Sequence, residues 1–272
     1  MEKLSIPSAS PQVARSRDLA SPPVIRLEGL SIAAARDTEV VDYVFSSLNR
    51  RCGGMLVTAN LDFLARARTD PECRRLYGDA DIIVADGMPL VWAAWLQGTP
   101  IPQRIAGSDL VWQLAEQAVR EGRSLYLLGG AGDSARRAAD VLLRRSPGIR
   151  IAGCSSPVIS SPVTAEELAT IREEIQRSRP DLVYVGFGSP KQEYLMRALR
   201  HEFPLVWMLG CGISLSFVAG DVSRAPRWMQ RAGFEWLHRL VIEPRRLFSR
   251  YILRNLPYAI GLMWRSVLAR YF

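Results

Sequence analysis

The sequence predicts a Rossmann-like α/β layered fold with a mostly parallel sheet. Short apolar runs alternate with longer segments of helical character from about residue 24 to about residue 210. The segments between the runs are long enough to be helices that cross over between parallel strands. The chain has 272 residues, of which 48% are hydrophobic, so it can bury the core that such a sheet needs.

The expected strands are the apolar runs that end in small or polar residues. They lie at 24–30, 54–60, 81–85, 124–130, 149–154, 181–188 and 205–210. The expected helices lie at 38–51, 61–70, 107–122, 132–146, 164–178 and 191–203, and another starts near Met88. Thr164 followed by Glu167 is a capping-box pattern, and Asp133 is a favourable N-cap type. Trp92 and Trp95, three residues apart among apolar neighbours, are expected in the core.

Composition divides the chain into three parts. Residues 1–23 are rich in Ser, Pro and Ala, lack the apolar run of a signal peptide, and are expected to be a flexible tail. Residues 24–222 form the predicted catalytic domain. Residues 223–272 hold ten arginines against two acids, Glu235 and Glu243, which accounts for the whole formal net charge of +8. This last part is therefore expected to be a basic appendage with an interaction surface.

The basic appendage mixes its arginines with nine aromatic residues, and Pro226, Pro244 and Pro257 are expected to cut it into short helices. Amphipathic helices rich in Arg, Trp and Leu suit an anionic bilayer surface. The same composition also fits nucleic acid or an oligomer interface, and we favour the membrane because lysine runs are absent. No apolar run approaches the ~18 residues of a membrane-spanning helix. We expect a peripheral membrane protein with no nucleic-acid partner, and the oligomeric state stays open.

Cysteine and histidine usage argues against a zinc site and a disulfide framework. The four cysteines are widely spaced without a CxxC pair, and the chain has only two histidines. We expect a reducing compartment, no metal and no cofactor.

Polar or glycine-rich sequence follows four of the expected strands, at 58–60, 85–87, 186–193 and 210–212. Ligands of open parallel sheets bind beyond the carboxyl ends of the strands, so these stretches are expected to line one cleft. Asp86 follows its strand and faces that cleft, where it either caps the next helix or does chemistry. Asp79 and Asp81 precede the same strand, so we interpret them as turn residues at the opposite edge rather than a metal-binding pair.

The loop GFGSPKQE, residues 186–193, joins an expected strand to an expected helix. Its glycines let the backbone approach a phosphate or a sugar, although a plain glycine turn explains the loop alone equally well. It is not a dinucleotide fingerprint, because Lys191 stands where a third small residue is needed. A lysine at a helix start opposes the helix dipole, which favours a ligand-binding role.

These motifs together resemble the WecG/TagA/CpsF family of bacterial glycosyltransferases, from about residue 30 to about residue 255. The resemblance is carried by TANLDFLARARTD, ADIIVADGMPLVWAAWLQGTPIPQRIAGSDL, LYLLGG, VYVGFGSPKQE and RAPRWMQRAGFEWLHRLVIEPRRLFSRY, in this order. It implies an inverting, metal-independent enzyme of bacterial surface polysaccharide or exopolysaccharide biosynthesis. Such an enzyme moves a sugar from a UDP-sugar to a saccharide on a polyprenyl diphosphate, at the cytoplasmic face of the inner membrane.

The resemblance also implies roles for individual residues. Asp86 would be the general base that deprotonates the acceptor hydroxyl, and Thr58 would act beside it. Residues that would bind or orient the substrates are Asn60, Arg104, Gly188, Pro190, Lys191, Gln192, Arg239, Arg245 and Arg246. The last three of these would close over the diphosphate.

One departure from the family pattern concerns the donor. Ser216 stands where the usual GGxFDxxAG pattern has an acid, which leaves the donor open between UDP-glucose and the UDP-N-acetylmannosamine type. Two other functions stay open from the residues alone: a Rossmann-type oxidoreductase, which the missing third glycine disfavours, and a non-enzymatic membrane-binding module. The acceptor hydroxyl and the final polymer are not encoded in any motif that we recognise.

Overall fold

The computed structural model describes residues 21–271, apart from the side chains of residues 231, 232 and 246. Six parallel strands form the main sheet in the order β4-β3-β8-β7-β5-β6. They are β3 (Gly54–Ala59), β4 (Ile82–Ala85), β5 (Ser124–Gly129), β6 (Arg150–Ser155), β7 (Leu182–Gly186) and β8 (Trp207–Gly210). The predicted α/β fold is confirmed. Most of the predicted tail, residues 1–20, lies outside the described residues.

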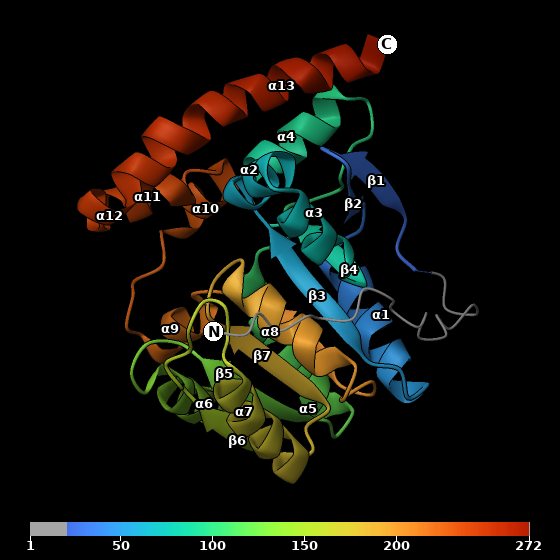
Figure 1. Cartoon of the computed structure of the whole chain (residues 1–272), viewed down its shortest axis with the longest axis vertical. Coiled ribbons are helices and arrows are strands. Elements are labelled where there is room, and N and C mark those ends of the chain that lie inside the picture. Colours follow the sequence, from blue (N-terminus) through green and yellow to red (C-terminus); the bar gives the residue numbers. More distant parts are fainter. Residues whose placement is uncertain (1–20, 272) are drawn as a thin grey trace.

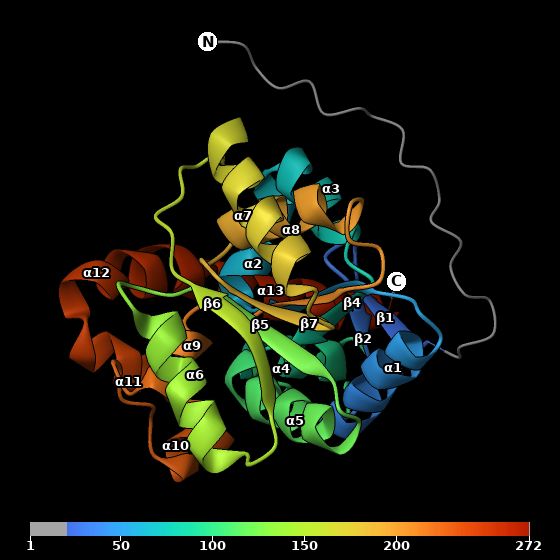
Figure 2. The same cartoon turned by 90° about the horizontal axis from the view of Figure 1, so that it is seen from below.

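Helices cover both faces of the sheet (Figure 2). One face carries α2 (Leu61–Thr69), α3 (Pro71–Gly78), α7 (Ala165–Ser178) and α8 (Lys191–Arg200). The other carries α1 (Asp37–Asn49), α5 (Gly107–Arg120), α6 (Ser134–Arg145) and α9 (Ser214–Ala219). Each face has its own hydrophobic core, and all strands of the main sheet except the edge strand β6 are almost fully buried. The sheet is therefore a rigid platform for the loops at its edges.

One of the two helix caps predicted from the sequence is present in the structure. The predicted capping box of α7 is present, with Thr164 accepting from the backbone of Glu167 and Glu167 accepting from the backbone of Thr164. Asp133 does not cap α6, because its carboxylate pairs with Arg136 and Arg137 instead. Helix α3 was not predicted; it starts at Pro71, where the Asp70 side chain accepts from two backbone amides.

The strand predicted at 24–30 is instead a hairpin of β1 (Val24–Leu27) and β2 (Leu30–Ala33), which pair with each other outside the main sheet. The two turn residues, Glu28 and Gly29, have φ values of 50° and 82°. Positive φ at both central residues is the requirement of the tight turn that suits a hairpin, so the chain reverses where an unbroken strand was expected.

The C-terminal segment wraps one end of the molecule as α10 (Arg227–Ala232), α11 (Glu235–Ile242), α12 (Pro244–Phe248), a π-helical stretch (Ser249–Asn255) and α13 (Leu256–Tyr271). Helix α13 lies along α4 (Met88–Leu96), as Figure 1 shows. In the described part of the chain, no helix is long and apolar enough to cross a bilayer.

Pro257 does not cut the segment as predicted. The helix continues from the π-helical stretch into α13, and the backbone amide of Leu256 donates to the carbonyl of Tyr251, five residues earlier. A proline ring clashes with the carbonyl four residues before it, and the wider turn of a π-helix relieves that clash. Ion pairs hold the segment to the rest of the fold, with Arg250 on Asp62 of α2 and Arg265 on Glu28 of the β1–β2 hairpin.

Candidate active site

The four polar strand ends lie side by side, because β4, β3, β8 and β7 are neighbours in the sheet and all run in the same direction. The loop after β4 is tied to β3 by a hydrogen bond from the backbone amide of Asp86 to the carbonyl of Ala59, 2.7 Å long. Gly107, which begins α5, lies so close to Thr58 that a Cβ there would be 3.2 Å from the threonine Oγ1. The four segments therefore gather at one edge of the sheet, as the sequence predicted, and a single cleft lined by all four stays a prediction.

Asp86 does not cap the helix that follows it. The N-cap of α4 is Gly87, and no side chain bonds to the free amides there. The carboxylate of Asp86 points instead toward the start of α5, where the amide of Gly107 donates to Oδ2 over a long 3.4 Å. The sequence left two roles open for Asp86, and the first of them, capping α4, is wrong. The carboxylate has only weak hydrogen-bond partners.

Burial raises the pKa of Asp86 to about 6, even though 29% of its side chain stays exposed. The Arg104 guanidinium, 3.7 Å away, opposes this rise, and the carboxylate of Glu235 adds to it. A carboxyl group with a pKa near 6 is ionised at neutral pH and is a stronger base than an ordinary aspartate. Asp86 can therefore accept a proton from a substrate.

Charged side chains from three distant parts of the chain meet beside Asp86. Arg104 is held near it because the amide of Ile105 donates to the carbonyl of Ala85 at the end of β4. Arg104 Nη1 also lies 3.1 Å from Glu235 of α11, whose other oxygen lies 3.3 Å from Arg224. Arg224 in turn makes two bonds to Asp109 of α5, 2.5 and 3.0 Å long.

Glu235, Arg224 and Asp109 were not among the residues predicted for the site. Glu235 is one of only two acids in a strongly basic segment, and this isolation was the one signal that the sequence offered. Its partner Arg104 is 131 residues away in the sequence. Short-range patterns carry no information about such a pair.

A cavity of about 490 Å³ opens between the region of α4 and α5 and helix α10 of the C-terminal segment. Met88 of α4, Arg104 and Asp109 line one side, and Arg227 and Gln230 of α10 line the other. Two guanidinium groups thus face one space next to Asp86. An anionic group such as a diphosphate fits this charge pattern.

The loop GFGSPKQE is held together from inside. The Gln192 side chain, 3% exposed, accepts hydrogen bonds from the backbone amides of Gly188 and Gly212, at 3.2 and 3.0 Å. Its amide nitrogen donates to Glu193, and burial raises the pKa of that carboxyl group. Gln192 therefore fastens the loop after β7 to the loop after β8, and its side chain is engaged with protein rather than presented to the cleft.

The other predicted residues of this edge are also engaged. Lys191 Nζ donates to the carbonyl of Ile159 over 2.6 Å, and Pro190 occupies the N-cap position of α8. Asn60 caps α2 by accepting from the amide of Phe63, and Thr58 donates to the carbonyl of Gly210. A substrate role for each of them stays a prediction.

Gly188 has a φ of 78°, and a Cβ added there would meet no atom within 4 Å. The backbone at this glycine is therefore open to a ligand.

The three arginines predicted to close over the diphosphate differ in their surroundings. Arg239 is partly buried and its Nε has no hydrogen-bond partner, whereas Arg245 is exposed. The side chain of Arg246 lies outside the described residues. Among the described side chains of the C-terminal segment, those of Glu235 and Arg224 carry charges that act on Asp86. The roles of the three predicted arginines stay predictions.

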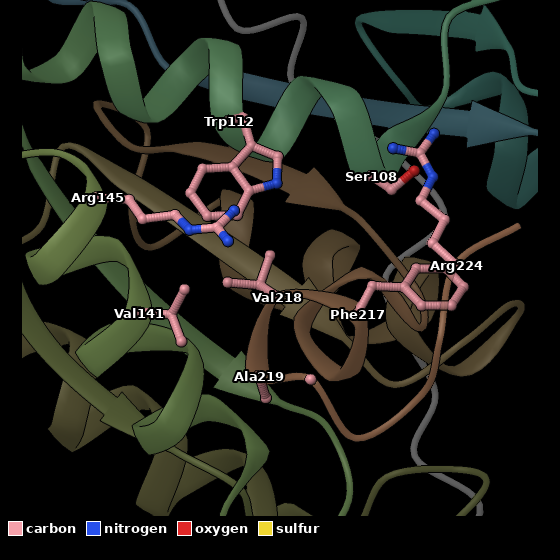
Figure 3. Close-up of a pocket in the computed structure, with 9 residues that line it drawn as sticks. Ser108, Trp112, Val141, Arg145, Phe217, Val218, Ala219 and Arg224 are labelled. Carbon is pink, nitrogen blue, oxygen red and sulfur yellow. The ribbon is translucent and has the colours of Figure 1, made fainter. Parts of the chain in front are cut away.

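A second cavity of about 350 Å³ lies between α5, α6 and α9 (Figure 3). At one end the Arg145 guanidinium lies over the ring of Trp112, 5.4 Å from its centroid, and at the other Arg224 reaches Ser108. Ser216, where an acid was expected, is buried in α9 beside this space, and its carbonyl accepts from the amide of Asp221. The carboxylate of Asp221 is bound by Ser134 and Arg137.

Among residues 21–271, no group of three or more His, Cys, Asp or Glu side chains gathers in the way that a metal ion requires.

Known proteins resemble this chain in sequence. A family model described as "Glycosyl transferase WecG/TagA/CpsF family" matches residues 25–271. The chain is 31% identical, over 77% of its own length and 81% of the relative's, to the N-acetylglucosaminyldiphosphoundecaprenol N-acetyl-beta-D-mannosaminyltransferase of Bacillus spizizenii. It is 29% identical to the protein of the same name from Bacillus subtilis, over 77% of this chain and 80% of that one.

Proposed function

The chain belongs to the WecG/TagA/CpsF family of glycosyltransferases, and from this premise we propose that it transfers a sugar from a UDP-sugar to a polyprenyl-diphosphate-linked saccharide. The resemblance stated from the motifs is confirmed, and the oxidoreductase and the non-enzymatic module are set aside. The transfer proceeds with inversion and without a metal ion, as part of bacterial surface polysaccharide synthesis. The observation that supports this most is an aspartate with a pKa of about 6 beside a cavity lined by two arginines.

In the proposed reaction, Asp86 takes the proton of the acceptor hydroxyl while the hydroxyl oxygen attacks the anomeric carbon of the donor sugar. The bond from that carbon to the UDP oxygen breaks, and its electron pair leaves with UDP. Attack from the side opposite UDP inverts the configuration. Arg104 and Arg227, which line the cavity, balance the charge that develops on the leaving diphosphate.

The glycine loops at the ends of β7 and β8 are the proposed donor site. Gln192 holds the backbone of Gly188 and Gly212 in place, so that these loops keep their shape when the donor arrives. Both relatives named above are N-acetyl-beta-D-mannosaminyltransferases, and UDP-N-acetylmannosamine is the first donor to test. UDP-glucose is the second, because Ser216 replaces the acid of the usual pattern.

The acceptor is a saccharide on undecaprenyl or another polyprenyl diphosphate, and the names of the two relatives contain such an acceptor. Thr58 and Asn60 orient the acceptor or the sugar near Asp86. Arg239, Arg245 and Arg246 contribute positive charge for the lipid-linked diphosphate.

Residues 223–272 also dock the enzyme on the cytoplasmic face of an anionic membrane. Exposed aromatic side chains gather on α4, α10, α11 and α13, which lie together at one end of the molecule (Figure 1). They are Trp92, Trp95, Trp228, Phe234, Trp236, Trp264 and Tyr271. The prediction that Trp92 and Trp95 lie in the core is wrong: they are 45% and 65% exposed, whereas Leu90, Ala93 and Ala94 of the same helix are buried in the cluster that contains Leu262 of α13. Aromatic residues among arginines suit a bilayer interface.

The proposal is tested with purified full-length protein, a panel of UDP-sugars and a synthetic lipid-linked N-acetylglucosaminyl diphosphate acceptor, assayed in the presence of a chelator. We expect transfer by the wild type and a rate at least about 100-fold lower for Asp86→Asn. Turnover by Asp86→Asn equal to that of the wild type contradicts the role of Asp86. Release of UDP only after divalent metal is added contradicts the metal-independent mechanism.

Membrane docking is tested by flotation with vesicles of neutral or anionic lipid. We expect binding to anionic vesicles that weakens with salt and with a double Trp95→Ser and Trp264→Ser substitution. Equal flotation of that variant and the wild type contradicts docking through the aromatic surface. Tight, salt-dependent binding to DNA instead of vesicles contradicts the choice of partner.

A further inference from the structure

The proposed reaction makes opposite demands on Arg104. A guanidinium close to the leaving diphosphate stabilises the charge that develops there. The same guanidinium close to Asp86 stabilises the ionised carboxylate and so weakens it as a base. Arg104 lies 3.7 Å from Asp86, and its positive charge lowers the pKa of Asp86. Without compensation, the group that helps the leaving group would hinder the base.

Glu235 supplies a second carboxylate to the same nitrogen. Arg104 Nη1 is 3.1 Å from Glu235 Oε2 and 3.7 Å from Asp86 Oδ1, so the hydrogen bond goes to Glu235 and Asp86 is the weaker partner. The side chains of Arg104 and Glu235 are 15% and 18% exposed. Solvent screens charges at this depth poorly. The hydrogen bond from Arg104 to Glu235 therefore changes how strongly Arg104 stabilises the ionised carboxylate of Asp86.

Glu235 is itself held in place from the other side. Its Oε1 lies 3.3 Å from Arg224 Nε, while the remaining two nitrogens of Arg224 bind both oxygens of Asp109. The described groups that act on Asp86 are thus Arg104 from the loop before α5, the amide of Gly107 from α5, and Arg224 and Glu235 from the C-terminal segment. Three carboxylates and three guanidinium groups meet in this cluster and at the wall of its cavity, namely those of Asp86, Glu235, Asp109, Arg104, Arg224 and Arg227.

We propose that Glu235 is a positioning residue of the sugar transfer, which holds Arg104 at the cavity and keeps it from neutralising Asp86. The proposal rests on the proposed function and deepens it. Glu235 begins α11, so the base reaches its full strength only when the C-terminal segment is docked on the catalytic layer. The pKa of Asp86 is consistent with this role, since burial raises it, Arg104 lowers it and Glu235 raises it.

The test replaces Glu235 by Gln, which preserves the shape of the side chain and removes its charge. The pKa of Asp86 is then expected to fall, by an amount on the order of half a pH unit, because the effect of Arg104 is no longer opposed. The acidic limb of the kcat/KM profile moves to lower pH, while kcat at pH 8 drops by up to about threefold, because a base that is weaker by half a pKa unit loses no more than that factor. Loss of packing alone lowers kcat at every pH and leaves the limb in place.

The control is Glu243→Gln, which removes the only other acid of the segment, and whose charge is not among those acting on Asp86. Its acidic limb is expected to coincide with that of the wild type. A Glu235→Gln limb that also coincides with the wild type overturns the proposal.

A second readout does not depend on activity. In the full-length protein, the ¹³C resonance of the Asp86 carboxyl group, assigned by its absence in Asp86→Asn, is titrated in the wild type and in Glu235→Gln. A lower pKa in the variant supports the proposal, and an equal or higher pKa overturns it. If the wild type transfers no sugar, the proposed function fails, and this titration still decides what Glu235 does to Asp86.

Discussion

Strand β4 has an aspartate next to each of its ends, and the protein treats the two in opposite ways. Asp81, before the strand, accepts from the amide of Met55 at 2.8 Å and pairs with Arg200 at 2.9 Å. Asp86, after the strand, has a 3.4 Å hydrogen bond and an arginine at 3.7 Å that is better bonded to another acid. The two side chains are about equally exposed, at 23% and 29%.

Exposure therefore does not distinguish the two acids; their partners do. Asp81 is saturated by an amide and a guanidinium that stitch β4 to β3 and α8, which is a structural role. Asp86 is surrounded by groups that bind it weakly, and its pKa is raised. A carboxylate that the fold leaves poorly compensated is the one available for chemistry. We interpreted Asp79 and Asp81 as turn residues rather than a metal-binding pair, and in the structure each of them forms an ion pair with an arginine of α8.

The largest expected difference between the two acids is in catalysis. Asp86→Asn removes the proposed base and should lower kcat by about 10²- to 10⁴-fold, the usual contribution of a positioned general base. Asp81→Asn should leave kcat within about twofold of the wild type when measured on folded protein, because Asp81 lies at the opposite edge of the sheet. Steady-state rates with a lipid-linked acceptor measure both. A similar loss in the two variants would erase the distinction.

The second difference is in stability: at pH 8 the Asp86 variant should gain stability and the Asp81 variant should lose it. The folded-state pKa of Asp86, about 6, lies above its ordinary value of 3.8, so folding favours its protonated form. The ionised group opposes folding once the pH rises through 6, by on the order of 2–3 kcal/mol. Asp86→Asn should therefore stabilise the protein at pH 8, and this gain should vanish below about pH 4. Asp81→Asn should destabilise it by about 1–3 kcal/mol through the weakened bonds to Arg200 and Met55.

Denaturant unfolding of both variants at pH 8 and near pH 4 measures these changes in the free energy of unfolding. A lower free energy of unfolding for Asp86→Asn than for the wild type at pH 8 contradicts the claim that the ionised carboxylate of Asp86 destabilises the folded protein.

The third prediction concerns the pH dependence of the wild type. Asp86 must be ionised to accept a proton, so kcat/KM should be level above pH about 7 and should fall tenfold per pH unit well below pH 6. An ordinary aspartate would move this limb about two units lower. The profile is read from initial rates in buffers of constant ionic strength, after the stability of the enzyme at each pH has been checked. A limb near pH 4 would mean that Asp86 titrates as an ordinary aspartate, which contradicts the prediction.

The smallest effect is expected at Asn60, a polar strand-end residue that does cap its helix. Asn60→Ala should cost about 1 kcal/mol of stability because the amide of Phe63 loses its acceptor. Asn60→Asp keeps the cap and should preserve stability. If Asn60 orients a substrate, Asn60→Asp lowers kcat/KM while its thermal midpoint stays unchanged. A wild-type kcat/KM in Asn60→Asp would reduce Asn60 to the structural role that Asp86 lacks.

The sequence was sufficient for the elements of the main sheet and for the position of Asp86 at the carboxyl end of its strand. Apolar runs and helical spacing are local properties, and a parallel sheet necessarily brings such strand ends to one edge. The hairpin at Glu28 and Gly29 was missed because only these two residues interrupt the apolar pattern, which resumes at Leu30. Pro257 misled for a related reason, since the π-helical stretch that accommodates it is formed by packing rather than by composition.

What only the tertiary structure decided is how the charges are shared. Nothing in the sequence pairs Arg104 with Glu235, or assigns Gln192 to the amides of two separate loops. Nor does it tell that Trp92 and Trp95 face outward. Secondary structure follows from neighbours along the chain, which the sequence lists in order. The strength of a base depends on every charge and every shielding atom within a few ångströms of it, and these come from segments that only the folded chain brings together.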